Sequence, residues 1–245
     1  MEEVYYFDAI KNKESFTRQE LLESFRKGGF ELGNAAFCKK VESMIRDGSL
    51  IRAGRNLYCI PQGNKSVYSH KYSELAAEVA ELLKEKYPLL DFSILELIQL
   101  NDFVNHQLAH NTIFLSVETD IMDFVFDTLK EQYPGKVLID PTVEIYHQYW
   151  SDNMIVIIKL TTEAPKGMVE AWHTKLEKLL VDIASEQLIR ESISESEYVN
   201  VYEDAFARYI VDESCLFRYA KRRGTDKKIC KFIKEKTNIT LRIKR

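Results

Sequence analysis

The 245-residue chain is 45% hydrophobic and 29% charged, a balance typical of globular proteins and unlike that of disordered chains. Its formal net charge of −4 excludes a uniformly basic protein that coats nucleic acid. No apolar run approaches the roughly 18 residues that span a bilayer, and the acidic first residues are unlike a signal peptide. We therefore expect a cytoplasmic protein without a membrane segment.

The charge is spread unevenly along the chain. Residues 14–65 carry nine Lys/Arg against six Asp/Glu, and residues 218–245 carry twelve against two. The remaining residues carry 13 Lys/Arg against 30 Asp/Glu. Two basic regions therefore flank an acidic body, and this asymmetry predicts a polyanionic partner at the basic regions.

Residues 16–46 predict two short helices. Thr17-Arg18-Gln19-Glu20 has the hydroxyl and glutamate of a capping box, and Gly28-Gly29 marks the end of the first helix. Asn34 is the expected cap of the second helix, which runs to Arg46. The apolar face of that helix is formed by Phe37, Val41, Met44 and Ile45. Its opposite face is polar, as a recognition helix in the major groove requires.

A basic turn between two short strands follows the second helix. Leu50-Ile51 and residues 57–60 read as strands, and Gly54-Arg55-Asn56 turns between them. The order helix, helix, ribbon is that of a winged helix-turn-helix, so residues 1–65 are predicted to bind DNA. The expected contacts are Asn34, Lys39, Lys40, Ser43, Arg52, Arg55 and Asn56. The alternative for each is a solvated surface position.

Residues 61–70 read as a linker to a larger domain, residues 66–245. In that domain we expect helices over 72–87, 94–108 (capped by Asp91 or Ser93), 121–132, 169–183 and 195–209, and strands over 112–118, 137–139 and 154–160. The continuous apolar run 154–160 predicts a buried central strand. The whole chain is therefore expected to be α+β, with an α/β domain that ends in helices.

A basic helical pair, 215–223 and 227–236, is predicted at the end of this domain. It is interpreted either as a solvated helix pair or as a contact surface for a polyanion or an acidic partner. The candidate contacts are Arg218, Lys221, Arg222, Arg223, Lys227 and Lys228. Asp182, on a leucine-rich helix, is a candidate buried carboxylate that pairs with an arginine of residues 218–223.

The sequence offers no familiar catalytic or cofactor motif. There is no glycine-rich phosphate loop, no GxSxG, no HExxH and no CxxC. His106 and His110 are spaced like a metal-ligand pair but lack the accompanying glutamate. We therefore expect no cofactor, no metal, no small-molecule substrate and no disulfide framework among the four cysteines.

A metal-dependent nuclease or a nucleotidyltransferase-like enzyme is the alternative. Asp120 and Asp140 follow predicted strands and Lys159 ends another, so carboxylates and a lysine could gather at one sheet edge. The nuclease signature, however, places an acidic residue two positions before the lysine. That position is Ile157, so the core motif is absent.

Two stretches resemble a known family. Residues 49–60 resemble the end of the N-terminal domain of abortive-infection antitoxins of the AbiEi type. Residues 174–182, followed by 217–223, resemble the "LEKxLVD" helix and basic C-terminal helix of the same family. The resemblance covers most of the chain in order through short motifs. The usual turn glycine before Tyr58 is replaced by Asn56-Leu57.

The resemblance implies the antitoxin of a type IV toxin–antitoxin system. In that family a winged helix binds and represses its own promoter, and the C-terminal domain opposes a nucleotidyltransferase-type toxin. Carried onto this chain, it implies DNA contacts by Lys39, Lys40, Arg52 and Arg55, and it implies no enzymatic activity. A third reading is a pure interaction module whose winged helix contacts protein.

Overall fold

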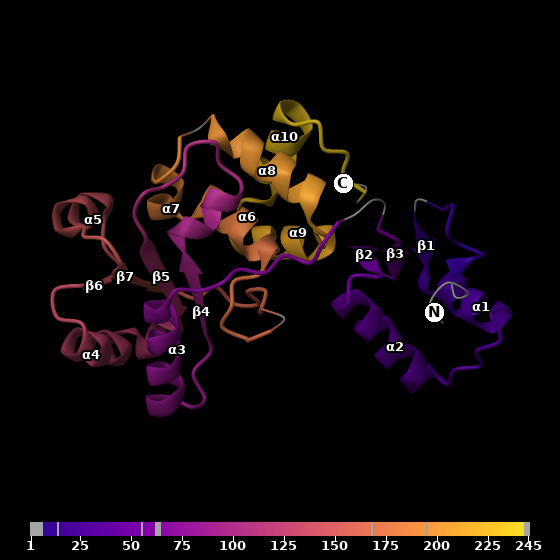
Figure 1. The fold of residues 1–245 in the computed structure, drawn as a ribbon, viewed down its shortest axis with the longest axis horizontal. Coiled ribbons are helices and arrows are strands. Elements are labelled where there is room, and N and C mark those ends of the chain that lie inside the picture. Colours follow the sequence, from indigo (N-terminus) through magenta and orange to yellow (C-terminus); the bar gives the residue numbers. More distant parts are fainter. Residues whose placement is uncertain are drawn as a thin grey trace.

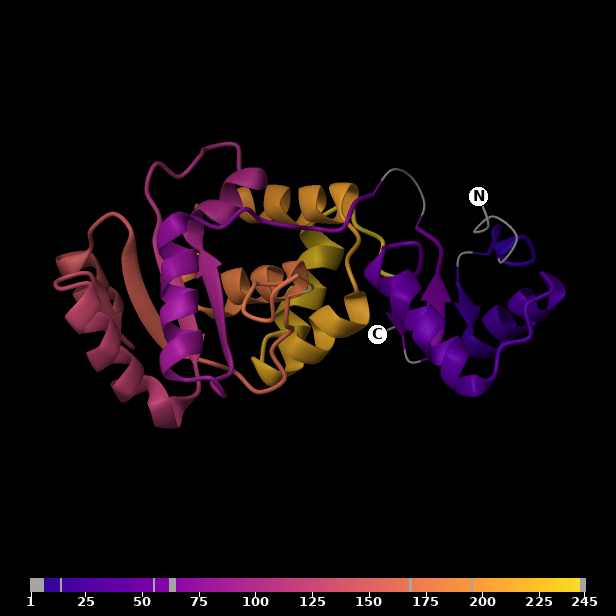
Figure 2. The ribbon, with the colours of Figure 1, turned by 60° about the horizontal axis from the view of Figure 1, so that its bottom comes forward.

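A computed structural model gives the fold and describes residues 7–13, 15–54, 56–61, 65–167, 169–194 and 196–242. A small N-terminal lobe lies at one end of the molecule's long axis, and a larger C-terminal body fills the rest (Figure 1). The second view shows the same separation, with the linker running from the lobe along the body (Figure 2). The described residues form an α+β protein, as predicted.

The N-terminal lobe contains two helices and a small sheet. Its elements are β1 (Phe16–Thr17), α1 (Arg18–Lys27), α2 (Asn34–Arg46), β2 (Ile51–Gly54) and β3 (Leu57–Cys59). The sheet is antiparallel with the order β1-β3-β2. The predicted helices and ribbon are therefore present in the predicted order. The core of the lobe is formed by Phe16, Leu21, Phe25, Phe37, Val41, Met44 and Leu50.

The caps of the two helices differ from each other. At α1 the capping box is confirmed, because the Thr17 side chain accepts from the Glu20 N–H and the Glu20 side chain accepts from the Thr17 N–H. The prediction that Asn34 caps α2 is wrong. Gly33 occupies the cap position and Asn34 is the first helical residue, with its side chain used elsewhere.

The C-terminal body is built on a four-stranded sheet with the order β4-β5-β7-β6. β4 (Phe92–Glu96) pairs antiparallel with β5 (Thr112–Val117). Both β5 and β6 (Val137–Ile139) run parallel to β7 (Met154–Lys159). β7 is therefore an interior strand that is buried up to Ile158, which confirms the predicted central strand.

Helices cover both faces of this sheet. They are α3 (Glu74–Lys86), α4 (Met122–Gln132), α5 (Val143–Tyr149), α6 (Leu176–Ser185), α7 (Gln187–Glu191), α8 (Glu197–Arg208), α9 (Glu213–Arg222) and α10 (Asp226–Lys236), with 3-10 helices η2 (Leu97–Asp102) and η3 (Thr119–Ile121). Side chains alternate between the faces of a strand. Ile113 accordingly joins the core under α3 and α4, and Phe114 joins the core under α6, α8 and α9.

The predicted helix over 94–108 is wrong. Residues 92–96 form β4, and only 97–102 turn into the short helix η2. All five residues of β4 are buried, because the strand pairs with β5 on one side while Ile94 also meets the 172–173 segment. Tertiary pairing therefore overrides a helical pattern. Asp91 and Ser93 consequently cap no helix.

Two other helix predictions need correction. The helix expected from residue 169 begins only at Leu176, because residues 169–172 form bends and turns and His173 pairs with Ile94 in a β-bridge. The Ile94 N–H donates to the Trp172 carbonyl at 2.8 Å. Helix α5 was not predicted. It is seven residues long and begins at the Thr142 cap, whose side chain accepts from the Ile145 N–H at 3.4 Å.

Lobe and body touch through the linker and the last described residues. Arg242 donates from Nε to Glu213 Oε1 at 2.9 Å and from Nη1 to Cys59 Sγ, on β3 of the lobe, at 3.1 Å. On the other side, Gly48 lies so close to Ile210 and Val67 that a Cβ atom would stand 2.8 and 3.1 Å from their side chains. The placement of the lobe therefore depends on residues distant in sequence.

Across the described part of the chain, no helix has both the length and the apolar character that a membrane crossing requires. The four cysteines, Cys38, Cys59, Cys215 and Cys230, are free thiols, as expected.

Candidate nucleic-acid interface

The outer face of α2 carries the first group of predicted contacts. Phe37, Val41 and Met44 are buried against the lobe, which turns Lys39 and Ser43 outward, and both side chains are exposed. Lys40 is half-buried and already engaged in an interaction within the protein. The position of Lys39 opposite the apolar stripe follows from helical periodicity, as the sequence predicted.

The ribbon carries the second group. Arg52, on β2, is exposed and also lines a cavity of about 460 Å³ between lobe and body. Asn56 is exposed at the turn with a φ of 56°, a left-handed conformation that asparagine adopts more readily than most residues. Asn56 therefore supplies a left-handed residue just before β3. Arg55 lies outside the described residues.

Arg18 joins the ribbon turn to the start of α2, a role that sequence reasoning missed. Its backbone N–H donates to the Asn56 carbonyl at 3.0 Å. Its guanidinium Nη2 donates to Asn34 Oδ1 and to Cys38 Sγ, each at 3.0 Å, and its Cζ lies 5.1 Å from the centre of the Phe37 ring. The Cys38 contact is the main cause that raises the pKa of Arg18, so the guanidinium remains charged.

The structure therefore brings some predicted residues together and leaves others apart. Asn34 and Asn56 meet through Arg18, although 22 positions separate them in the sequence. Lys39 and Ser43 face outward from the same helix, and no contact joins them to Asn56 among the described residues. A signal for Arg18 existed in the sequence, because it follows the cap residue Thr17 directly and so had to lie at a helix start.

The basic residues of α9 and α10 form a separate surface. Arg218, Lys221, Lys227 and Lys228 are exposed on the two helices. Arg222 is exposed and forms an ion pair with Glu163. Spacings of three and four residues put cations of one helix on the same side, as on α10 for Lys227, Lys231 and Lys234.

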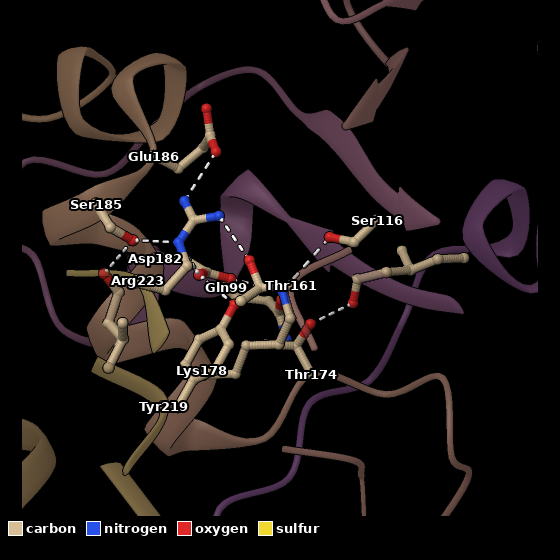
Figure 3. A network of polar contacts seen from close by, with 12 residues as sticks. Gln99, Ser116, Thr161, Thr174, Lys178, Asp182, Ser185, Glu186, Tyr219 and Arg223 are labelled. Atoms are coloured by element: carbon tan, nitrogen blue, oxygen red, sulfur yellow. Dashed lines mark hydrogen bonds and ion pairs between the residues drawn. The ribbon is translucent and has the colours of Figure 1, made fainter. Parts of the chain in front are cut away.

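A buried charged network lies beneath this surface (Figure 3). Lys178 Nζ is 2.5 Å from Asp182 Oδ2, and both side chains are almost fully buried. The Tyr219 hydroxyl donates to Asp182 Oδ1 at 2.9 Å, and Arg223 Nε lies 3.9 Å from the same oxygen. Asp182 therefore meets an arginine of the basic segment, as predicted, and gains two further partners.

The guanidinium of Arg223 forms hydrogen bonds within this network through all three of its nitrogens. Nε donates to Ser185, Nη1 to Thr161 and Nη2 to Glu186, at 3.0, 3.1 and 3.0 Å. Burial opposes its charge, but Asp182, Tyr219 and Glu186 together more than offset this, and the pKa of Arg223 is raised. All three nitrogens are thus engaged inside the protein, which leaves none for the external anion that the sequence suggested.

The residues of the enzyme alternative do reach one edge of the sheet. Asp140 directly follows β6 and Lys159 ends β7, and the carboxyl ends of parallel strands share an edge. Asp120 lies in η3, which follows β5. All three side chains are exposed. In the ranges that the structure describes, no three His, Cys, Asp or Glu side chains gather as metal ligands.

Comparison with known proteins identifies a family without a described activity. Residues 36–239 match the family described as "Family of unknown function (DUF6577)". The chain belongs to this family. No curated protein matches the chain. A solved structure, "Crystal structure of RV2827C protein from Mycobacterium tuberculosis", aligns at 12% identity and a TM-score of 0.24, covering 95% of this chain and 80% of that one.

Proposed function

We propose that this family member is a non-enzymatic DNA-binding regulator of bacterial origin, and that its N-terminal lobe is a winged helix-turn-helix. The observation that carries the proposal is the bridge made by Arg18. It fixes the start of α2 against the ribbon turn through Asn34 and Asn56. A helix and a ribbon held in one orientation can contact a groove and the neighbouring phosphates together.

The charges of the lobe support the same proposal. Lys39 on α2 and Arg52 on β2 are exposed, and neither is held in an ion pair among the described residues. Phosphate contacts by such side chains supply most of the non-specific affinity for DNA. In this proposal Ser43 faces base edges, while Lys39, Arg52, Arg55 and Asn56 meet the DNA backbone. The Asn34 side chain holds Arg18, and Lys40 is engaged within the protein.

Within this proposal the protein is the antitoxin of a type IV toxin–antitoxin system in the cytoplasm, as the resemblance of residues 49–60 and 174–182 to AbiEi-type antitoxins implies. It represses its own promoter. Its larger body meets a nucleotidyltransferase-type toxin, for which the exposed cations of α9 and α10 are a contact surface. Co-expression with the product of a neighbouring gene, followed by copurification, tests the partner directly.

DNA binding is tested by fluorescence anisotropy on the DNA upstream of the gene, over a range of salt. We expect Arg52→Ala and Lys39→Ala each to weaken binding and to reduce the log–log salt slope by about one. Lys86→Ala, which removes an equal charge from the end of α3 in the body, is the matched control and leaves both quantities unchanged.

Unchanged binding in the two lobe variants, or no binding at low salt, contradicts the proposal. Metal-dependent cleavage of the DNA that disappears in Asp140→Ala supports the enzyme alternative instead.

A further inference from the structure

A cavity of about 520 Å³ lies between helices of the body, away from the candidate nucleic-acid interface. Its walls come from α7, α8 and α10 and from the end of α6. These helices pack together at the top of the body in Figure 1. The volume falls within the range of small-molecule sites, which are concave, mostly apolar and placed between helices in many proteins.

Aromatic rings form one wall of this cavity. Tyr202 and Phe232 lie with ring centres 5.4 Å apart, and Tyr198 flanks Phe232 at 6.5 Å. The Tyr202 hydroxyl donates to the Leu180 carbonyl at 2.6 Å, and the Tyr198 hydroxyl to the Arg190 carbonyl at 2.9 Å. Because both hydroxyls are bonded to backbone, their rings are fixed. Tyr202 is almost fully buried, whereas the half-buried Tyr198 and Phe232 offer carbon surface to an apolar ligand.

Two cations reach the same cavity from different helices. Arg190 is half-buried in the last turn of α7, and Lys228 is exposed in the first turn of α10. Neither side chain has an ion-pair or hydrogen-bond partner in the described part of the protein. Glu191 also lines the cavity and accepts from Gln187 Nε2 at 2.9 Å. The charged side chains of the lining are therefore two cations and one carboxylate, beside carbon walls.

The first turn of α10 adds to this positive potential. The cap residue Thr225 makes no side-chain hydrogen bond to that turn. The backbone N–H groups of the first turn of α10 and the dipole of this helix therefore favour an anion. The carboxylate of Asp226, in the same turn, offsets part of this positive potential. Cations, helix end and aromatic wall are independent features that converge on one kind of ligand.

We propose that this cavity binds a small amphipathic anion, with an aromatic body against Tyr198 and Phe232 and an oxyanion head between Arg190 and Lys228. The head is a carboxylate or a phosphate, since both accept hydrogen bonds from guanidinium and ammonium groups. The site is separate from the DNA-binding proposal and stands or falls independently of it.

Isothermal titration calorimetry of the full chain with 4-phenylbutyrate and with phenyl phosphate tests the site. The neutral control ligand is 4-phenylbutanol. We expect at least one anion to bind and the alcohol to bind at least about tenfold more weakly, because charge-assisted hydrogen bonds are lost. Binding of the carboxylate alone or of the phosphate alone identifies which head the site prefers.

Variants locate the binding. Arg190→Gln and Lys228→Gln are each expected to lower the affinity of the cavity for the anion by about tenfold. Lys231→Gln, on the same helix and outside the cavity lining, leaves affinity unchanged. Ala184→Leu fills the cavity and abolishes binding, and a retained thermal transition shows that the variant folds. Equal affinity for the alcohol, unaltered binding in the two charge variants, or no binding of either anion at about 10 mM overturns the proposal.

Discussion

The Tyr219 hydroxyl donates a 2.9 Å hydrogen bond to the Asp182 carboxylate, which ties α9 to α6 across 37 residues of sequence. Asp182 also balances the buried Lys178 ammonium. Burial, and next the Asp182 carboxylate, raise the pKa of Tyr219, so the hydroxyl stays protonated and remains a donor. The donor side of this bond is therefore not lost as the pH rises.

This arrangement predicts unequal costs for neighbouring substitutions. Asp182→Asn leaves Lys178 buried without its counter-charge and is expected to cost about 3 to 5 kcal/mol of unfolding free energy. Tyr219→Phe removes one hydrogen bond and is expected to cost about 1 to 2 kcal/mol. Urea unfolding measures both, with the exposed Asp123→Asn on α4 as the control. Equal losses of unfolding free energy in Asp182→Asn and Tyr219→Phe would contradict the role of Asp182 as the counter-charge of Lys178.

Glu197, at the start of α8, predicts a pH dependence. The hydrogen bond from His106, followed by those from Asn200 and the Asn105 backbone, lowers the pKa of Glu197 to about 2. A depressed carboxyl pKa stabilises the fold above its unfolded value of roughly 4.3, and this contribution is lost as pH falls towards 2. The thermal midpoint should therefore fall between these values more steeply in the native protein than in Glu197→Gln.

The control for that measurement is Glu235→Gln, an exposed acid on α10. It should keep the pH profile of the native protein. A Glu197→Gln profile that parallels the native one down to pH 2 shows that this carboxyl contributes nothing.

Substitution of Gly48 tests how closely the lobe packs against Ile210 and Val67. Its φ of 79° disfavours a side chain, and a Cβ would stand 2.8 Å from Ile210 Cδ1. Gly29 has a similar φ of 86° with nothing within 4 Å, so Gly29→Ala reports backbone strain alone, about 1 kcal/mol. Gly48→Ala should cost about 1 to 3 kcal/mol more, because Ile210 must move. Chemical denaturation gives the difference, and equal losses contradict close packing at Gly48.

Arg242 joins the lobe to the body, and its removal should loosen the contact between them. Arg242→Ala removes its bonds to Glu213 and to Cys59. We expect the lobe to move more freely, with a larger radius of gyration in solution scattering and faster tryptic cleavage at Lys65 in the linker. Lys236→Ala, an exposed cation at the end of α10, is the control and should match the native protein.

The lobe was largely readable from the sequence because its signals are local. A cap, an apolar stripe and a basic turn each lie within a few residues of one another, and α1, α2 and β3 appear where those signals lie. The outward position of Lys39 follows from the same periodicity. The function attached to this pattern stays a prediction.

The structural features that the sequence did not predict depend on contacts between segments that are distant in the sequence. Residues 94–96 look helical until β5 and the 172–173 segment pair with them. Arg18 looks like an ordinary surface residue until Asn34 and Asn56 approach it from two other elements. Arg223 looks like one more exposed cation until Glu186 and Asp182 enclose it. Each of these outcomes requires the fold to be known.

The bond between Arg242 and Cys59 also has a consequence for synthesis. The two residues are 183 positions apart. At ribosomal rates of about 5 to 20 residues per second, Arg242 is made roughly 10 to 40 s after Cys59. The lobe, whose core is local, has that interval to fold while still unattached. Its final orientation is therefore set last, after the body that fixes it has been translated.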